Sequence, residues 1–184
     1  MIKFVGSFER VPQLPQTQVP EYAFIGRSNV GKSSLINAIA GSVIARTSKT
    51  PGRTQSLNLF NFHDRVMIMD LPGYGYAKVS KTDTARWLER LEEYLLNRRQ
   101  LNRLFILIDS RVGIKESDLN LMYFCDAHGI SYQIVLTKKD KKVREKDQDK
   151  INSDGHPAMM EHIFETSSEK KYGIEDLRKA IGIE

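Results

Sequence analysis

Short apolar runs alternate along this chain with longer segments in which apolar residues recur at helical spacing. The short runs are typical of buried strands, and the periodic segments are typical of amphipathic helices. The runs predict strands at residues 22–25, 57–62, 66–69, 104–108, 132–136 and 163–164. The periodic segments predict helices at residues 33–40, 84–99, 118–128 and 173–181. Strands that alternate with helices form mostly parallel sheets covered on both faces, so the pattern predicts a three-layer α/β fold with a six-stranded, mostly parallel sheet.

The first twenty residues show neither period. Residues 11–20 contain three prolines, which fix the backbone dihedral angle φ and remove backbone donors. We therefore expect residues 1–20 to form an extended lead-in over the surface, followed by a single domain from 21 to 184. Within that domain, the turn-like residues 63–65 predict that the strands on either side pair as a hairpin.

A glycine-rich turn stands between the first predicted strand and the first predicted helix. Residues 26–33 read GRSNVGKS, which fits the phosphate-binding pattern G-x-x-x-x-G-K-[ST]. The glycines let backbone N–H groups wrap around phosphates, and the helix start adds its positive dipole end. We expect Lys32 to reach the β- and γ-phosphates and the Ser33 hydroxyl to bind Mg²⁺. The alternative is a turn that binds nothing, which the complete pattern in the right context disfavours.

The expected nucleotide contacts of this turn extend over consecutive residues. They are Gly26, Arg27, Ser28, Asn29, Val30, Gly31, Lys32, Ser33 and Ser34.

A second motif indicates that the base of the bound nucleotide is guanine. A polar run directly follows the predicted strand at 132–136, and its four residues are expected contacts of the nucleotide: Thr137, Lys138, Lys139 and Asp140. The Asp140 carboxylate could accept hydrogen bonds from the ring N–H and the exocyclic amine of guanine, whereas adenine would present a lone pair there. The stem of Lys138 could lie over the base. The alternative is a solvated charged turn.

A further loop could contact the guanine oxygen, although its composition is common. Its residues are Thr166, Ser167 and Ser168.

A third signal is the run of residues 70–73, Asp-Leu-Pro-Gly, after the predicted strand at 66–69. Asp70 could hold Mg²⁺ through a water molecule. The Gly73 amide would meet the γ-phosphate, with Leu71 and Pro72 between them. The alternative is an ordinary Pro-Gly turn.

The polar loop at 47–55 should supply a threonine that completes the Mg²⁺ shell. We expect Thr54, because it stands just before a predicted strand, with Thr47 and Thr50 as competitors. Together with Lys32 and Gly73, Thr54 forms the expected catalytic set. The neighbouring residues expected to contact GTP are Gly52, Arg53, Gln55 and Ser56.

These three motifs resemble those of translation-factor-type GTPases, and the run DLPGYGYAKV at 70–79 resembles the signature of the EngB group, also called YsxC or YihA. The runs at 49–55 and 26–37 are also close to that group's pattern. The resemblance implies a Ras-like P-loop GTPase domain and Mg²⁺ contacts from Ser33 and Thr54. It also implies a bacterial GTPase that acts in assembly of the large ribosomal subunit and in normal septum formation. Two alternatives are a GTP-regulated protein scaffold in cell division and, less favoured, an ATP-dependent kinase.

Two residues affect the expected mechanism. Tyr74 stands where Ras-like enzymes carry a glutamine that orients the attacking water, so we expect slow intrinsic hydrolysis that a partner accelerates. We also expect Tyr74 and Tyr76 to meet ribosomal partners. Asn29 resembles the asparagine that coordinates K⁺ in cation-dependent GTPases, and the alternative is an asparagine that only shapes the loop.

Composition sets further limits. The 184 residues include one cysteine, Cys125, so an intrachain disulfide is excluded and a reducing cytoplasm is expected. Cys125 lies in an apolar helical run, so we expect it in the core. No stretch approaches the roughly 20 apolar residues of a membrane helix, so we expect no membrane insertion. We expect the chain to be a monomer.

The net charge of +5 favours an anionic partner. We expect ribosomal RNA and large-subunit assembly intermediates to bind a basic surface, and the alternative is a solvated helix face with mixed charges. The arginines of that expected surface are Arg86, Arg90, Arg98, Arg99 and Arg103.

Overall fold

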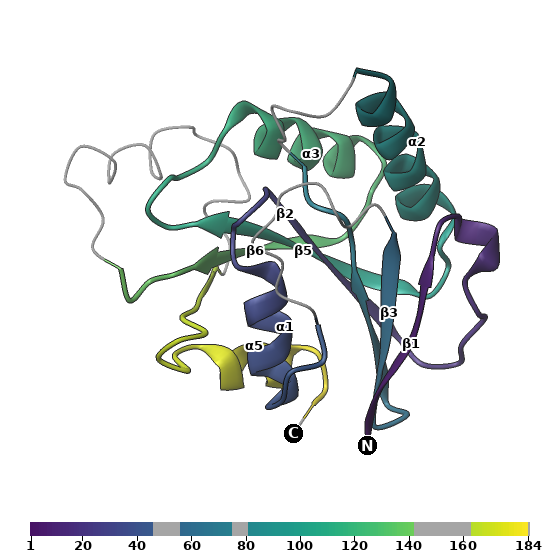
Figure 1. The fold of residues 1–184 in the computed structure, drawn as a ribbon. Helices are drawn as coiled ribbons and strands as arrows, with labels where there is room; N and C mark the ends of the chain where they lie inside the picture. Colours follow the sequence, from purple (N-terminus) through teal and green to yellow (C-terminus); the bar gives the residue numbers. More distant parts are fainter. Residues whose placement is uncertain (46–55, 75–80, 142–162, 184) are drawn as a thin grey trace.

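A twisted seven-stranded sheet forms the centre of the molecule, with helices packed on both faces (Figure 1). The computed structural model describes residues 1–45, 56–74, 81–141 and 163–183. The strands are β1 (Ile2–Phe8), β2 (Glu21–Gly26), β3 (Leu57–Phe62), β4 (Val66–Asp70), β5 (Leu101–Asp109), β6 (Tyr132–Thr137) and β7 (Phe164–Glu165). The helices are η1 (Val11–Gln13, a 3₁₀ turn), α1 (Lys32–Ala40), α2 (Lys81–Asn97), α3 (Glu116–Ala127) and α5 (Ile174–Ala180).

The sheet order is β1-β3-β4-β2-β5-β6-β7. Strands β4, β2, β5, β6 and β7 pair in parallel, as the alternating pattern predicts. The predicted hairpin is confirmed, because β3 and β4 pair antiparallel across the turn at 63–65. His63 and Asp64 have φ angles of 58° and 57°, the left-handed values that a tight hairpin turn requires.

The sheet has seven strands rather than the expected six. Residues 2–8, which we expected to belong to an extended lead-in, form β1 and pair antiparallel with β3 at the edge of the sheet. The apolar pattern of this segment is irregular because Phe4 and Val5 are exposed and the register shifts between Phe4 and Gly6. An edge strand of this kind is held by backbone pairing, which leaves little trace in the side-chain pattern.

Two apolar cores cover the two faces of the sheet. Helices α2 and α3 lie on one face and α1 and α5 on the other, as Figure 1 shows. The first core includes Tyr94, Met122 and Cys125, and the second includes Ile36 and Leu177. Cys125 is therefore a core residue, as expected, and burial raises the pKa of its thiol to about 12.

The amino-terminal end of β2 carries a buried ion pair. Glu21 is fully buried and accepts hydrogen bonds from Arg98 Nη2 at 2.7 Å and from the Tyr94 hydroxyl at 2.6 Å. Arg98 also donates to the Pro15 carbonyl oxygen at 2.9 Å, which ties the proline-rich segment to the domain. The expectation that Arg98 belongs to an RNA-binding surface is therefore wrong, because its guanidinium is enclosed and neutralised.

The opposite end of the parallel strands collects the loops that carry the sequence motifs. Strands β2, β4, β5 and β6 all end at this edge, where ligands bind in open α/β sheets. None of the helices in the described residues is long and apolar enough to cross a membrane.

Candidate guanine-nucleotide site

The turn between β2 and α1 has the backbone that the glycine-rich motif predicts. Asn29 and Gly31 have φ angles of 61° and 103°, so the loop curls before α1 begins at Lys32. A Cβ atom on Gly26 would lie 2.8 Å from the Leu107 carbonyl oxygen and 2.9 Å from Val30 Cγ1. Only glycine therefore lets β2 pass this close to β5 before the chain turns.

Lys32, which follows this turn at the start of α1, is in direct contact with Asp70. The Lys32 ammonium donates a hydrogen bond to Asp70 Oδ1, and both side chains are largely buried. Asp70 is the last residue of β4, and Ser33 follows Lys32 in the first turn of α1. The structure thus brings together the predicted phosphate-binding lysine and the two predicted Mg²⁺ residues that it describes. A hydroxyl and a carboxylate are oxygen ligands of the kind that Mg²⁺ prefers.

The segment after Asp70 pairs with the phosphate loop. Tyr74 N donates to the Gly26 carbonyl oxygen at 3.2 Å, and Ser28 N donates to the Tyr74 carbonyl oxygen at 3.0 Å. A Cβ on Gly73 would lie 3.0 Å from the Gly26 carbonyl oxygen, so this residue must be small. Leu71 is fully buried and anchors the segment in the core.

The Tyr74 side chain turns into the protein. Its hydroxyl donates to Asp118 Oδ1 at 2.6 Å, and its ring packs against Trp87 with centroids 6.0 Å apart. Burial and the neighbouring Asp118 carboxylate raise the pKa of Tyr74 well above its ordinary value. Because Tyr74 is only 8% exposed, the expectation that it meets a partner is wrong. Tyr76 lies outside the described residues.

The predicted base-reading loop is joined to the phosphate loop. The Thr137 hydroxyl donates to the Val30 carbonyl oxygen at 2.7 Å, and Lys138 Nζ donates to the Asn29 carbonyl oxygen at 2.6 Å. The Lys138 stem crosses Gly31, where an added Cβ would lie 3.5 Å from Lys138 Cε. Two loops that are more than a hundred residues apart in the chain therefore form one rim.

A cavity of about 560 Å³ lies beside this rim. Its walls come from the phosphate loop, from α1 and from the two loops that we expected to read the base. They are Gly31, Ser34, Asn37, Ala38, Ser42, Val43, Thr137, Lys138, Asp140, Lys141, Ser168 and Glu169. The volume falls within the range of small-molecule sites.

Lys139 is the one residue of the run at 137–140 that does not border this cavity. Its side chain is exposed and forms an ion pair with Glu165, with Nζ 2.8 Å from Oε1. Its backbone N–H donates to the Thr166 carbonyl oxygen at 3.1 Å. The Lys139 ammonium is thus directed to the end of β7, and the expected contact of Lys139 with the nucleotide stays a prediction. Lys139 joins the two loops that border the cavity.

Asp140 is oriented by its neighbours in this cavity. The Ser167 hydroxyl donates to Asp140 Oδ1 at 2.5 Å, and Lys141 Nζ lies 3.1 Å from Oδ2. The Ser167 hydrogen bond and the Lys141 charge hold the pKa of Asp140 below its ordinary value, so it is an ionised acceptor at neutral pH. Ser167 therefore orients the carboxylate, while Thr166 is buried and donates its hydroxyl to the Leu136 carbonyl oxygen at 3.0 Å.

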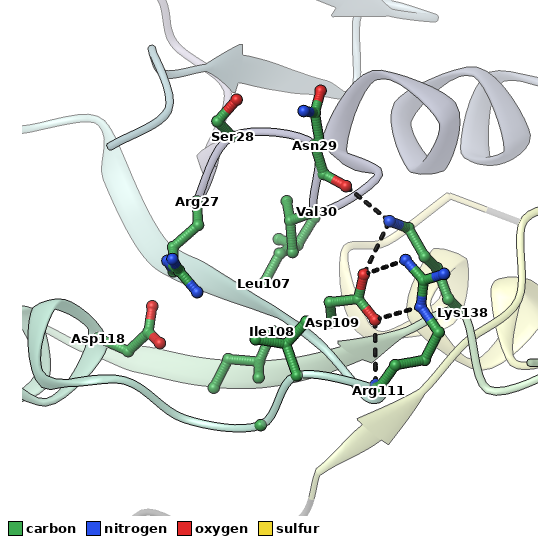
Figure 2. Close-up of a pocket in the computed structure, with 12 residues that line it drawn as sticks. Arg27, Ser28, Asn29, Val30, Leu107, Ile108, Asp109, Arg111, Asp118 and Lys138 are labelled. Carbon is green, nitrogen blue, oxygen red and sulfur yellow. Dashed lines mark hydrogen bonds and ion pairs between the residues drawn. The ribbon is translucent and has the colours of Figure 1, made fainter. Parts of the chain in front are cut away.

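Sequence reasoning missed a charged cluster at the end of β5, which Figure 2 shows. Asp109 Oδ2 accepts hydrogen bonds from Lys138 Nζ at 2.8 Å and from Arg111 Nη2 at 2.7 Å. Burial alone would raise the pKa of Asp109, but the hydrogen bonds from Arg111 and Lys138 outweigh it and lower the pKa to about 2. An aspartate at a strand end with an arginine two residues on was the available signal, and it is a common pattern.

Arg27 contributes its backbone to the phosphate loop, while its side chain points toward Asp118 across a second cavity (Figure 2). Burial raises the pKa of Asp118, although the Tyr74 hydrogen bond and the Arg27 charge oppose this rise. Ser56, another expected contact, lies 3.4 Å from Asn58 Oδ1 through its hydroxyl. Four expected residues lie outside the described part of the chain: Gly52, Arg53, Thr54 and Gln55.

Comparison with known proteins points to GTP-binding proteins. The sequence profile of a family described as "50S ribosome-binding GTPase" matches residues 21–138. A "Probable GTP-binding protein EngB" from Gluconobacter oxydans (strain 621H) is 43% identical, with 97% of this chain and 81% of that protein covered. A protein of the same description from Ruegeria sp. (strain TM1040) is 46% identical, with 97% and 86% covered.

Solved structures share the fold. The crystal structure of a probable GTP-binding protein engB superposes with a TM-score of 0.69 at 22% identity and covers 88% of this chain and 96% of the other. Era in complex with MgGDPNP and nucleotides 1506–1542 of 16S ribosomal RNA gives a TM-score of 0.67 at 25% identity, with 90% and 56% covered.

Proposed function

The chain belongs to the EngB family of GTP-binding proteins, and we propose that it hydrolyses GTP slowly and cycles as a switch in assembly of the large ribosomal subunit. The observation that carries the nucleotide part is the joining of three motif loops at one edge of the sheet. Lys32 meets Asp70, Tyr74 pairs with the phosphate loop, and Thr137 and Lys138 bond to its carbonyl oxygens. Such a rim offers a phosphate cradle and a base cavity side by side.

In this proposal Asp140 reads guanine. Its ionised carboxylate, held by Ser167, accepts from the ring N–H and the exocyclic amine of the base. Adenine would place a lone pair against the same carboxylate, and an unpaired buried acceptor is costly. Ser168 and the Lys138 stem border the same cavity and would enclose the base plane.

The phosphates would lie over the turn at 26–34. Lys32 would neutralise the β- and γ-phosphates, and the Gly73 amide would meet the γ-phosphate. The Ser28 hydroxyl is buried and makes no hydrogen bond with any described residue, so it can donate to a phosphate oxygen. Ser33 and Thr54 would bind Mg²⁺ directly and Asp70 through water, and the ion would supply neutralisation of charge that develops during hydrolysis.

Hydrolysis by the isolated chain should be slow. Tyr74 occupies the position of the water-orienting glutamine, and its side chain donates to Asp118 instead of facing the phosphate loop. A partner would therefore have to supply part of the catalytic arrangement. The Asn29 side-chain amide points away from the Lys138 contact in Figure 2, and it could coordinate K⁺ beside the phosphates. Equal hydrolysis rates in potassium and sodium salts would remove the potassium part of the proposal.

Ribosomal RNA is the proposed macromolecular partner. The chain carries a net charge of +5, and Arg86 and Arg99 are exposed on and just after α2. On the family resemblance we also propose a role in septation, and on the single cysteine a cytoplasmic location, with the chain acting as a monomer. The second candidate, a GTP-regulated scaffold without an RNA role, is favoured by the mixed charges of α2, in which Glu89, Glu92 and Glu93 accompany the arginines.

Co-sedimentation with purified large-subunit particles tests the switch. We expect binding with a non-hydrolysable GTP analogue, weaker binding with GDP, and a loss of at least about tenfold in affinity between about 50 and 200 mM salt. The paired variant Arg86→Ala/Arg99→Ala should bind more weakly and show a shallower salt slope. Binding that ignores both the nucleotide and the salt would refute a role on ribosomal RNA and favour the scaffold.

A further inference from the structure

The carboxylate of Asp109 is clamped by Arg111, which is not among the residues that line the base cavity. Arg111 donates from Nε to Oδ1 at 2.9 Å and from Nη2 to Oδ2 at 2.7 Å. We propose that Arg111 is a positioning residue for nucleotide retention: through Asp109 it fixes the Lys138 ammonium against the phosphate loop and so slows release of bound guanine nucleotide. The inference rests on the nucleotide binding proposed above.

Lys138 is the bridge between the two loops. Its Nζ donates both to the Asn29 carbonyl oxygen at 2.6 Å and to Asp109 Oδ2 at 2.8 Å. Lys138 and Asn29 have φ angles of 59° and 61°, which non-glycine residues seldom adopt. The ammonium therefore joins the two loops where each turns through a left-handed residue.

Arg111 restrains Asp109 on the one side where the carboxylate borders open space. A cavity of about 320 Å³ lies beside the Asp109 side chain, bordered by Val30, Leu107 and Ile108 (Figure 2). With Lys138 as its only partner, the carboxylate could rotate about its Cα–Cβ bond toward this space. The planar, bidentate guanidinium and the Arg111 backbone N–H, which donates to Oδ1 at 3.0 Å, fix the plane of the carboxylate.

Release of a nucleotide requires the phosphate loop and the base loop to separate. Two hydrogen bonds between side chain and backbone oppose this separation, from Thr137 to Val30 and from Lys138 to Asn29. A mobile Asp109 would weaken the second bond and leave the first intact. Loss of Arg111 should therefore speed release. Asp140 stays oriented by the Ser167 hydroxyl, although it loses the longer-range attraction of the Arg111 charge, so the choice of base should change far less than the release rate.

Stopped-flow release of a fluorescent GDP analogue from the full chain tests the inference. We expect Arg111→Ala to accelerate release about three- to tenfold, the range typical of residues that act through a network. Asp109→Ala should accelerate release more, because it also removes the counter-charge of Lys138. In the Asp109→Ala background, Arg111→Ala should add no further acceleration, and Arg111→Lys should restore part of the wild-type rate.

Two further readouts separate positioning from a general loss of structure. The ratio of GDP to IDP affinity should change far less than the release rate in Arg111→Ala, since IDP lacks only the amine that Asp140 reads. The thermal midpoint of Arg111→Ala should match that of Arg99→Ala, a control with the same charge change at the far end of the sheet.

Unchanged release in Arg111→Ala, or equal acceleration with and without Asp109, would overturn the inference and leave the proposed function standing. A wild-type chain that shows no guanine-specific binding would overturn both.

Discussion

Glu21 and Asp109 are carboxylates at opposite ends of neighbouring strands, and each is bound by an arginine and a second donor. Glu21 begins β2 and accepts from Arg98 and the Tyr94 hydroxyl, whereas Asp109 ends β5 and accepts from Arg111 and Lys138. The exposed fractions differ. The side chains of Glu21 and Arg98 are 0% and 3% exposed, and those of Asp109 and Arg111 are 10% and 43% exposed.

This difference in exposure shows that the position of an ion pair in the sheet, more than its chemistry, decides whether it stabilises the fold or shapes a binding site. At the amino-terminal end of β2 the pair is sealed by the proline-rich segment and can only stabilise the fold. At the carboxyl end of β5 the same kind of pair borders loops and a cavity, so it can set the geometry of a binding site.

The largest expected effect follows from removing one partner of the buried Glu21–Arg98 ion pair. Arg98→Ala leaves the Glu21 carboxylate enclosed without its counter-charge, which should lower the free energy of unfolding by about 3–5 kcal/mol. Urea denaturation measures this loss, and Arg99→Ala, an exposed neighbour, should change stability by less than about 0.5 kcal/mol. A loss below about 1 kcal/mol for Arg98→Ala would show that the pair is not sealed.

A matched pair of tyrosine variants compares the two ends directly. The hydroxyls of Tyr94 and Tyr74 each donate to a buried carboxylate at 2.6 Å, on Glu21 and Asp118 respectively. Replacing either with phenylalanine should cost about 1.5–3 kcal/mol of unfolding free energy. Only Tyr74→Phe should also alter GDP release, because the Tyr74 backbone pairs with the phosphate loop. If Tyr94→Phe changes release as much, the two ends are not independent.

The stability of the protein at acidic pH gives a further test of the Asp109 ion pairs. Because the pKa of Asp109 is about 2 in the folded protein and near 3.8 when unfolded, the unfolded state binds more protons between these values. The stabilisation by Asp109 is therefore present above about pH 4 and is lost as the pH falls toward 2. Urea midpoints measured from pH 7 to pH 2 should fall less steeply in Asp109→Asn than in the wild type. Parallel curves would contradict the low pKa.

The smallest expected effect is spectroscopic. Burial raises the pKa of both Tyr74 and Tyr94 well above 10, while the chain contains seven tyrosines. Ultraviolet titration of the native protein should show exposed tyrosines ionising near pH 10 and these two ionising only on alkaline unfolding. The stabilisation from their hydrogen bonds is present below pH 10 and is lost as the pH rises through the raised values. Complete ionisation near pH 10 in the folded protein would contradict their burial.

Sequence reasoning found most of the fold and placed the candidate site, because its motifs follow strand ends and strand ends meet at one edge. It missed β1, whose pairing is made by the backbone, and it misplaced Arg98 and Tyr74 on the surface. Both side chains are polar at one end and long, so their burial depends on a distant partner, Glu21 or Asp118, which no local pattern reveals.

The partners of the charged residues around the base cavity were also not predictable from local sequence. Sequence reasoning counted Lys139 with its neighbours as a nucleotide contact, and its pairing with Glu165 depends on how β7 lies beside β6. The Asp109–Arg111 clamp escaped notice because it acquires meaning only beside Lys138. A motif therefore places a loop, while the direction of each side chain in that loop depends on partners that the motif does not contain.

The most direct measurement is the affinity of the purified chain for GDP and GTP, with ATP as competitor, in the wild type and in Asp140→Asn. The account predicts tight binding that ATP cannot displace even in about thousandfold excess, since a site built to pair a base N–H rejects bases that lack it. It also predicts that Asp140→Asn loses guanine affinity and gains affinity for xanthine nucleotides, whose second carbonyl can accept from the new amide. Binding that is indifferent to the base, or unchanged by Asp140→Asn, would contradict the account.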